Sequence, residues 1–280
     1  MRIQRWALTL AALAVAAGSC GKLDAQQTFM ERFRAHNAET AKVQPPMVTP
    51  LVATDPRLIQ YVRLAFSHQY TASGTETTSY GNSRGAGITV ANRFEFDWLF
   101  PPYIQHNSTA ADGFGDTALV AKYRIASGDA KHGNYEIAAL LNHCFATGSH
   151  KNGALTDSFT PTVAVVKDVR QFAFISSLGG VMPTGKIAAQ GRTINWHEVA
   201  QMHATSQMWL ELENNASFYF SGTHDGRMQN FVTPGAFYVL RKKHWGPAHS
   251  YAVFAGGMQI ATSGFHAYNH NLISEVRVLF

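Results

Sequence analysis

The stretch AYNHNLISEVRVLF, residues 267–280, decides the fold because its side chains alternate in character from one residue to the next. One set comprises Leu272, Ser274, Val276, Val278 and Phe280, and the other comprises Asn271, Ile273, Glu275, Arg277 and Leu279. Successive side chains of a strand point to opposite faces, so the stretch predicts a sheet with one apolar and one mostly polar side. An alternating strand that ends the chain on an aromatic residue is typical of the closing strand of an outer-membrane barrel. A half-buried strand of a soluble protein alternates in the same way, so the rest of the chain must decide.

The amino terminus predicts export from the cytoplasm. Arg2 and Arg5 precede an apolar run over residues 6–17, which is too short for a membrane helix but suits a secretory signal. We expect a signal peptide over residues 1–25, cleaved after Ala25. The alternative is lipidation of Cys20, which follows Ala17, Gly18 and Ser19 in a loose form of the lipoprotein pattern.

Composition narrows the class further. Cys144 is the only cysteine that follows the predicted signal, so an internal disulfide cannot stabilise the folded part. Hydrophobic residues make up 46% of the chain, yet after residue 25 no apolar run is long enough for a membrane helix. The formal charge of +5 is spread along the chain without a run of Lys or Arg, which gives no support for nucleic-acid binding.

The chain divides into three predicted regions: the signal peptide over 1–25, an amino-terminal extension over 26–56 and a barrel over 57–280. The extension is polar and carries Pro45, Pro46 and Pro50, which predicts a periplasmic segment and not a separate domain. It could instead fold into the pore, and the sequence leaves that choice open.

From Leu58 onward the pattern repeats as strands of alternating side chains separated by turn residues, which predicts an all-β, transmembrane, antiparallel up-and-down barrel. The predicted strands are Leu58–Tyr70, Tyr80–Val90, Arg93–Tyr103, Asp116–Ser127, Asn134–Thr147, Ser158–Lys167, Gln171–Pro183, Thr193–Thr205, Met208–Gly222, Met228–Arg241, His249–Ser263 and Ala267–Phe280. These are about twelve strands, an even number that leaves both chain ends in the periplasm. Short and long connections alternate along the chain, as periplasmic turns and outer loops do, although the connection over residues 242–248 is long on the periplasmic side.

One face of these strands is predicted to meet lipid. The strand over residues 93–103 places Phe96 and Trp98 opposite Glu95 and Asp97. Further lipid-facing candidates are Leu119, Tyr123, Ile125, Leu210, Leu212, Phe218 and Phe220. Aromatic residues expected at the membrane interfaces are Trp98, Tyr103, Trp196, Trp209 and Trp245.

The opposite face supplies the predicted lumen lining. Its charged members are Arg63, Arg93, Glu95, Asp97, Lys122, Arg124, Glu136, Glu211, Glu213, Glu275 and Arg277. Ion pairs in a narrow barrel would fix its shape, whereas separated ions would line a wet channel and select solutes. Both interpretations stay open.

Several short motifs resemble one family of outer-membrane proteins. They are DGFGD at 112–116, KYR at 122–124, LGGVMPTGK at 178–186 and NW at 195–196. Together they resemble the outer-membrane transporter family associated with the MetA pathway of phenol degradation, which is similar to the channels for fatty acids and aromatic hydrocarbons. The resemblance covers most of residues 61–280 and implies a barrel that passes small, hydrophobic or aromatic solutes, without catalytic residues.

We therefore predict a bacterial outer-membrane channel for small-molecule solutes that has no enzyme activity and needs no cofactor. Its expected partners are outer-membrane lipid and the barrel-assembly machinery, which would recognise Val276, Val278 and Phe280 in the last strand. The histidines are too scattered for a recognisable zinc site. The alternatives are a structural barrel without transport and a barrel enzyme of the lipase or acyltransferase type, in which Ser217 with Glu213 or Ser177 with His197 would react.

Overall fold

The computed structural model describes residues 29–81, 85–240 and 251–280. The chain divides into two compact units, residues 1–35 and residues 36–280. Helix α2 runs Phe29–Lys42, and its residues from His36 onward belong to the second unit. Among the described residues, no helix combines the length and apolar character needed to cross a membrane.

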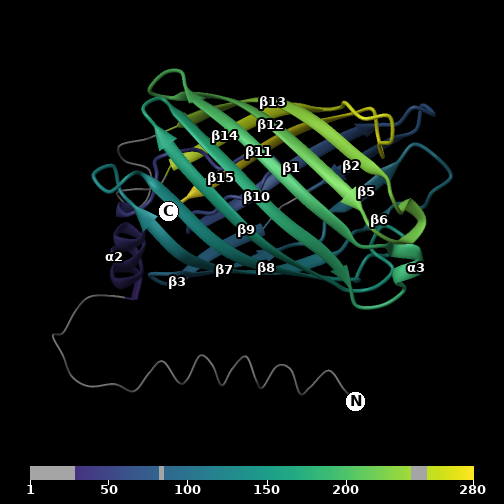
Figure 1. Cartoon of the computed structure of the whole chain (residues 1–280), viewed down its shortest axis with the longest axis horizontal. Helices are drawn as coiled ribbons and strands as arrows, with labels where there is room; N and C mark the ends of the chain where they lie inside the picture. The colour runs from purple at the N-terminus through teal and green to yellow at the C-terminus, as the bar shows by residue number, and fades with distance from the viewer. Residues whose placement is uncertain (1–28, 82–84, 241–250) are drawn as a thin grey trace, which may run out of the picture. The chain divides into compact units, whose positions relative to one another are not determined.

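The second unit is built from a single antiparallel sheet of fifteen strand pieces (Figure 1). The pieces are β1 Tyr61–Tyr70, β2 Glu76–Tyr80, β3 Gly85–Ala91, β4 Phe94–Leu99, β5 Tyr103–His106, β6 Gly113–Phe114, β7 Thr117–Gly128, β8 Tyr135–Phe145, β9 Ser158–Val169, β10 Phe172–Pro183, β11 Thr193–His203, β12 Met208–Tyr219, β13 Met228–Leu240, β14 Tyr251–Ala261 and β15 His270–Leu279. Two short helices lie between strands, α3 Ile187–Gln190 and the 3₁₀ helix η1 Gly222–His224.

The sheet closes on itself because its last strand pairs with its first. β15 lies antiparallel to β1 along its whole length, from Leu279 opposite Tyr61 to His270 opposite Tyr70. Closure leaves neither of these terminal strands with an unpaired edge, which is the arrangement that lets strands exist where water is absent. The predicted antiparallel up-and-down barrel is confirmed.

The number of barrel strands agrees with the prediction. Three of them are interrupted, as β2 with β3, β4 with β5, and β6 with β7, so the fifteen pieces form a closed ring of twelve strands. The break between β4 and β5 falls at Pro101 and Pro102, which have no N–H to donate to a neighbouring strand. The second strand begins at Glu76, so the connection that precedes it is shorter than the predicted loop over residues 71–79.

The two faces of the sheet separate as the alternation predicts. On β15, Leu272 and Val276 point outward with 48% and 38% of their surface exposed, whereas Ile273 and Arg277 point inward with 5% and 1%. On β4, Phe96 and Trp98 are exposed and Glu95 and Asp97 are buried. The outside of the barrel is therefore apolar, and its charged side chains are gathered inside.

One aromatic residue departs from the expected interface positions. Trp98, Tyr103 and Trp196 are exposed, but Trp209 is only 8% exposed and stacks on His203 with ring centroids 4.4 Å apart. The alternation explains the difference, because Trp209 lies next to outward-facing Leu210 and so must point inward. Trp245 lies outside the described residues.

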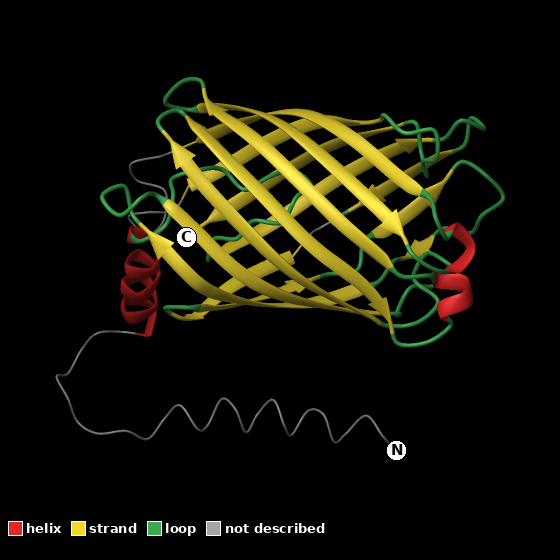
Figure 2. Cartoon of the chain, in the orientation of Figure 1, coloured by secondary structure: helices red, strands yellow, loops and turns green. Residues whose placement is uncertain are grey.

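The barrel has two distinct ends (Figure 2). We call the end that carries residues 36–42 and Phe280 the terminal end, where Asn37 Nδ2 donates to the Phe280 carbonyl. The opposite end, called the loop end, carries α3, η1 and the connection over residues 146–157. Within the described residues, the turns at the terminal end include the short ones at 92–93, 170–171 and 204–207, as expected.

Candidate functional site

The terminal half of the bore is occupied by the chain itself. We call residues 44–60, between α2 and β1, the inner segment. Most of its side chains are buried, and its own hydrogen bonds reach six of the strands: β1, β4, β7, β11, β12 and β15. The sequence left open whether this segment would enter the pore, and these contacts place it inside.

Two glutamates of β12 hold the inner segment by its backbone amides. Leu51 N donates to Glu211 Oε1 at 3.2 Å, and Val52 N and Ala53 N each donate to Glu213 at 2.9 Å. An extended segment without a strand partner has unpaired N–H groups, and burying such groups is costly unless an acceptor is supplied. The two carboxylates supply acceptors for three successive amides.

Two arginines hold the same segment by its carbonyl groups. Arg277 on β15 donates to the carbonyl oxygens of Thr49 and Pro50, both at 2.6 Å. Arg63 on β1 donates to the Leu51 carbonyl at 2.8 Å. Anionic side chains thus take the amides and cationic side chains take the carbonyls, so each side of the peptide backbone meets the charge that suits it.

The wall is also shaped to receive the segment. Leu51 lies against Gly235 and Gly257, which face each other across β13 and β14. A Cβ atom at either glycine would lie only 2.5 Å from Cδ1 of Leu51, so any larger residue would collide with it. Beside this contact, Gln201 Nε2 donates to the Val48 carbonyl at 2.9 Å.

The end of the segment is fixed by a second group of charges. Lys122 Nζ lies 2.8 Å from both the Arg57 carbonyl and Glu95 Oε1, and Glu95 also accepts the Ile59 amide. Arg57 pairs with Asp55 at 2.7 Å. These two residues complete the polar network, and the sequence offered no signal for them because they lie outside the alternating strands.

Arg124 joins the same group to the end of α2. Its guanidinium donates to the Thr40 carbonyl at 3.3 Å and to Gln44 Oε1 at 2.6 Å. Gln44 Nε2 in turn donates to the Leu58 carbonyl at 3.2 Å. The two ends of the inner segment are therefore linked through one side chain.

The predicted lumen residues are brought together with one exception. Glu95, Asp97, Lys122, Arg124, Glu136, Glu211, Glu213, Glu275 and Arg277 are buried and Arg63 is half-buried. Ion pairs join Arg63 to Glu275, Arg277 to Glu275, Lys122 to Glu95 and Arg124 to Glu136, at 2.5–2.8 Å. Arg93 does not join them, because it lies in the turn before β4 begins and its side chain is exposed.

The loop half of the bore has a different lining, which we call the loop-side chamber. Its inward-facing strand residues include Gln69, Asn142, Thr160, Ser177, Asn195, His197, Asn215, Gln229, Thr233, Gln259 and Asn271. Amides and hydroxyls predominate, and no carboxylate, lysine or arginine occupies an inward position among the described strand residues on this side. Among the inward strand positions that the structure describes, the charged groups are thus confined to the half that holds the inner segment.

Several polar atoms of the chamber have no protein partner. Asn142 Oδ1, His197 Nδ1, Asn215 Oδ1 and Asn271 Oδ1 are buried and accept or donate no hydrogen bond within the protein. Asn215 and Asn271 are only 5% and 3% exposed. Buried polar groups are nearly always paired with protein, water or ligand, so these atoms require a water or a guest molecule as partner.

An aromatic pair forms part of the chamber wall. Tyr268, in the connection between β14 and β15, stacks on Phe231 of β13 with ring centroids 4.6 Å apart. The Tyr268 hydroxyl donates to Gln259 Oε1 at 2.5 Å, and Ala267 N donates to Gln229 Oε1 at 2.8 Å. The connection is therefore held against inward-facing side chains of two strands.

The residues of the rival enzyme interpretation occupy the same chamber. Ser177 and His197 are direct cross-strand neighbours, and Asn215 follows His197 on the next strand. Nδ1 of His197 is unpartnered. Ser217 lies opposite Asn195 and Gln229, while the carboxylate of Glu213 is engaged with the inner segment. No group of residues in the described part of the chain could hold a metal ion.

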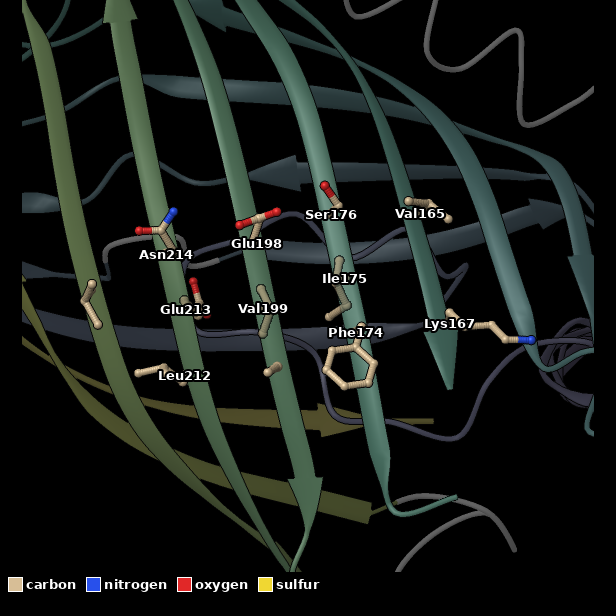
Figure 3. Close-up of a pocket in the computed structure, with 12 residues that line it drawn as sticks. Val165, Lys167, Phe174, Ile175, Ser176, Glu198, Val199, Leu212, Glu213 and Asn214 are labelled. Carbon is tan, nitrogen blue, oxygen red and sulfur yellow. The ribbon is translucent and has the colours of Figure 1, made fainter. Parts of the chain in front are cut away.

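The outer wall carries one unexpected polar row (Figure 3). Glu198 points outward from the middle of β11 and is exposed, with Ser176 and Asn214 as its cross-strand neighbours. A hollow of about 510 Å³ lies on this wall, and exposed Phe174 and Leu212 are among its lining residues.

The comparisons with known proteins support the fold. The chain is similar to the COG4313 outer membrane channel from Pseudomonas putida F1, with 13% identity and a TM-score of 0.57 over 84% of this chain and all of the other. It is also similar to the NanC porin, with 10% identity and a TM-score of 0.51 over 79% of this chain and 98% of the other. No protein-family model and no curated protein matches the chain, so the resemblance to the MetA-pathway family stays a prediction.

Proposed function

We propose that this protein is an outer-membrane channel for small solutes whose bore is closed at the terminal half by its own inner segment. The observation that carries the proposal is the hydrogen bonding of Leu51, Val52 and Ala53 to Glu211 and Glu213 inside a closed ring. Water can replace each polar bond that is lost when the segment is released. Burial of Met47, Val48 and Leu51 in the apolar cluster of the bore opposes that release. Passage of a solute then requires the inner segment to move.

The outside of the barrel supports placement in the outer membrane. Exposed apolar residues on most strands suit acyl chains, and closure of the ring satisfies the backbone there. The likeness to outer-membrane channels agrees with this placement. In the proposed orientation the terminal end faces the periplasm, which also suits recognition of Val276, Val278 and Phe280 by the assembly machinery.

The solute class expected from the family resemblance is hydrophobic or aromatic. The half-buried Tyr268 ring, which stacks on buried Phe231, gives an aromatic solute one contact surface. The amide-rich lining beside this ring suits a polar solute better. Transport of small solutes in general is therefore the proposal.

A disulfide lock tests the closure. Leu51→Cys with Gly235→Cys, in a Cys144→Ser background, would join the inner segment to the wall, because the only close neighbour of a Cβ at Gly235 is the Leu51 side chain that the cysteine replaces. We expect oxidised protein in planar bilayers to conduct poorly and reduction to raise the conductance several-fold. Leu51→Cys alone should not respond to reductant. Equal conductance of the locked and reduced forms would contradict closure, and absence of flux for every solute in both forms would contradict transport.

A further inference from the structure

We propose that the loop-side chamber is a recognition site for neutral polyhydroxylated solutes such as uncharged sugars. This inference rests on the proposed channel function and names the solute class that the site accepts. It departs from the hydrophobic class that the family resemblance implies.

The lining of the chamber has unused hydrogen-bonding capacity. Asn215 Oδ1, Asn271 Oδ1 and His197 Nδ1 are buried and unpartnered, and all three belong to side chains on the inward register. A hydroxyl both donates and accepts, so a solute with several hydroxyls can satisfy carbonyl oxygens and ring nitrogens alike. An apolar solute would displace water from these atoms and give nothing back, which penalises hydrocarbons.

The Tyr268 ring provides an aromatic face beside these groups. Tyr268 stacks on Phe231, and Phe231 is the cross-strand neighbour of Asn215. Binding sites for small molecules combine such apolar faces with a few placed polar groups. A sugar ring has the matching character, since its C–H face is apolar and its rim carries hydroxyls.

The charge of the chamber lining also favours neutral solutes. The inward strand positions of the chamber that the structure describes carry no carboxylate, lysine or arginine, while the ions of the terminal half are engaged with each other and with the inner segment. Arg227, near the loop end, lies over the Phe265 ring at 5.8 Å from its centroid. The Asp116 carboxylate, also at the loop end, is engaged with the amides of Gly148 and Ala154. A charged solute would therefore lose hydration without meeting a free opposite charge on the strands of the chamber, which favours neutral solutes.

Binding to the full-length protein in detergent tests the inference without requiring flux. The probes are maltose as the neutral sugar, glucuronate as a charged analogue and toluene as the aromatic hydrocarbon, followed by calorimetry. We expect maltose to bind at least tenfold more tightly than either competitor. Asn215→Leu and Tyr268→Ala should each weaken maltose binding about tenfold or more.

Asn214→Leu supplies the matched control, because Asn214 is the adjacent residue of β12 and points to the outer wall. It should leave maltose affinity unchanged. Tighter binding of glucuronate or toluene, or equal affinity in wild type and Asn215→Leu, would overturn the inference. Flux of all three probes without preference would also overturn it while leaving the channel function intact. Maltose binding without any flux would support the recognition site and contradict the channel function.

Discussion

Glu198 and Glu213 are the same side chain on neighbouring strands, and their positions give them opposite surroundings. Glu213 points into the bore and accepts two backbone amides, whereas Glu198 points to the outer wall and is exposed. The two side chains point to opposite faces of the sheet because successive side chains of a strand alternate between the faces. The chemistry of a residue here follows from its face and not from its type.

The outward position of Glu198 predicts a stability effect. Glu198→Leu should raise the free energy of unfolding in lipid bilayers by up to about 2 kcal/mol, because a charge on the lipid-facing side is costly near the middle of a bilayer. Reversible denaturant titration in vesicles measures this, with Glu198→Gln expected between the two. A less stable leucine variant would indicate that Glu198 has a partner on the outer wall.

At the scale of elements, the backbone of the inner segment forms hydrogen bonds with side chains of the barrel strands. It has no strand neighbour of its own, so Glu211, Glu213, Arg277 and Arg63 replace a ladder of hydrogen bonds with side-chain bonds. Such a contact depends on a few groups and can be weakened one residue at a time.

Glu213→Ala should loosen this segment. The change leaves the amides of Val52 and Ala53 without an acceptor, at about 1–3 kcal/mol each. With Val52→Cys in a Cys144→Ser background, maleimide labelling should accelerate at least about tenfold, since about 1.4 kcal/mol corresponds to a factor of ten. The control is Glu198→Ala on the neighbouring strand, which should label as slowly as the parent. Identical labelling of all three proteins would show that Glu213 does not hold the segment.

The last strand makes a second prediction at this scale. Deletion of Phe280 should reduce the amount of assembled barrel several-fold, because the terminal aromatic is the expected handle for the assembly machinery. The deletion also removes an amide that donates to the Gln60 carbonyl at 3.2 Å. Phe280→Tyr keeps both features and should assemble normally. Immunoblots of membrane fractions measure the amount of assembled barrel. Equal yields of the deletion variant and wild type would refute the role of Phe280 in assembly.

At the scale of the whole molecule, closure of the ring and the distribution of apolar surface belong together. Pairing of β15 with β1 satisfies the backbone, and large apolar side chains such as Leu64, Leu178 and Phe220 are 57–61% exposed on the outside. A soluble protein seldom exposes so much contiguous apolar surface. The surface has a function only if acyl chains cover it.

We therefore expect residues 26–280, the part that would remain after the predicted signal cleavage, to need detergent or lipid to stay dispersed. Refolded into detergent micelles it should elute as a single species with strand-rich circular dichroism. Diluted into plain buffer it should aggregate. A compact monomer that is stable in buffer would contradict the membrane placement on which the channel function depends.

The sequence by itself determined the strands, their two faces and their number, because the alternation of side chains is a local property with a period of two residues. It also placed most of the charged lining, including Glu95, Lys122 and Arg277. Trp209 was assigned to an interface although its position beside Leu210 already pointed it inward. The prediction that Arg93 lines the lumen is wrong, because β4 begins one residue later and alternation does not define that boundary.

Only the tertiary structure decided what fills the bore. The inner segment has no alternation, and its position depends on contacts with residues far away in the chain, such as Glu213 and Arg277. The loop-side chamber also depends on tertiary structure. Its lining residues come from different strands, and the stagger of the closed ring places them at the same height along the barrel axis. Local pattern fixes which face a residue occupies, whereas ring closure fixes which residues share a height and what lies between them.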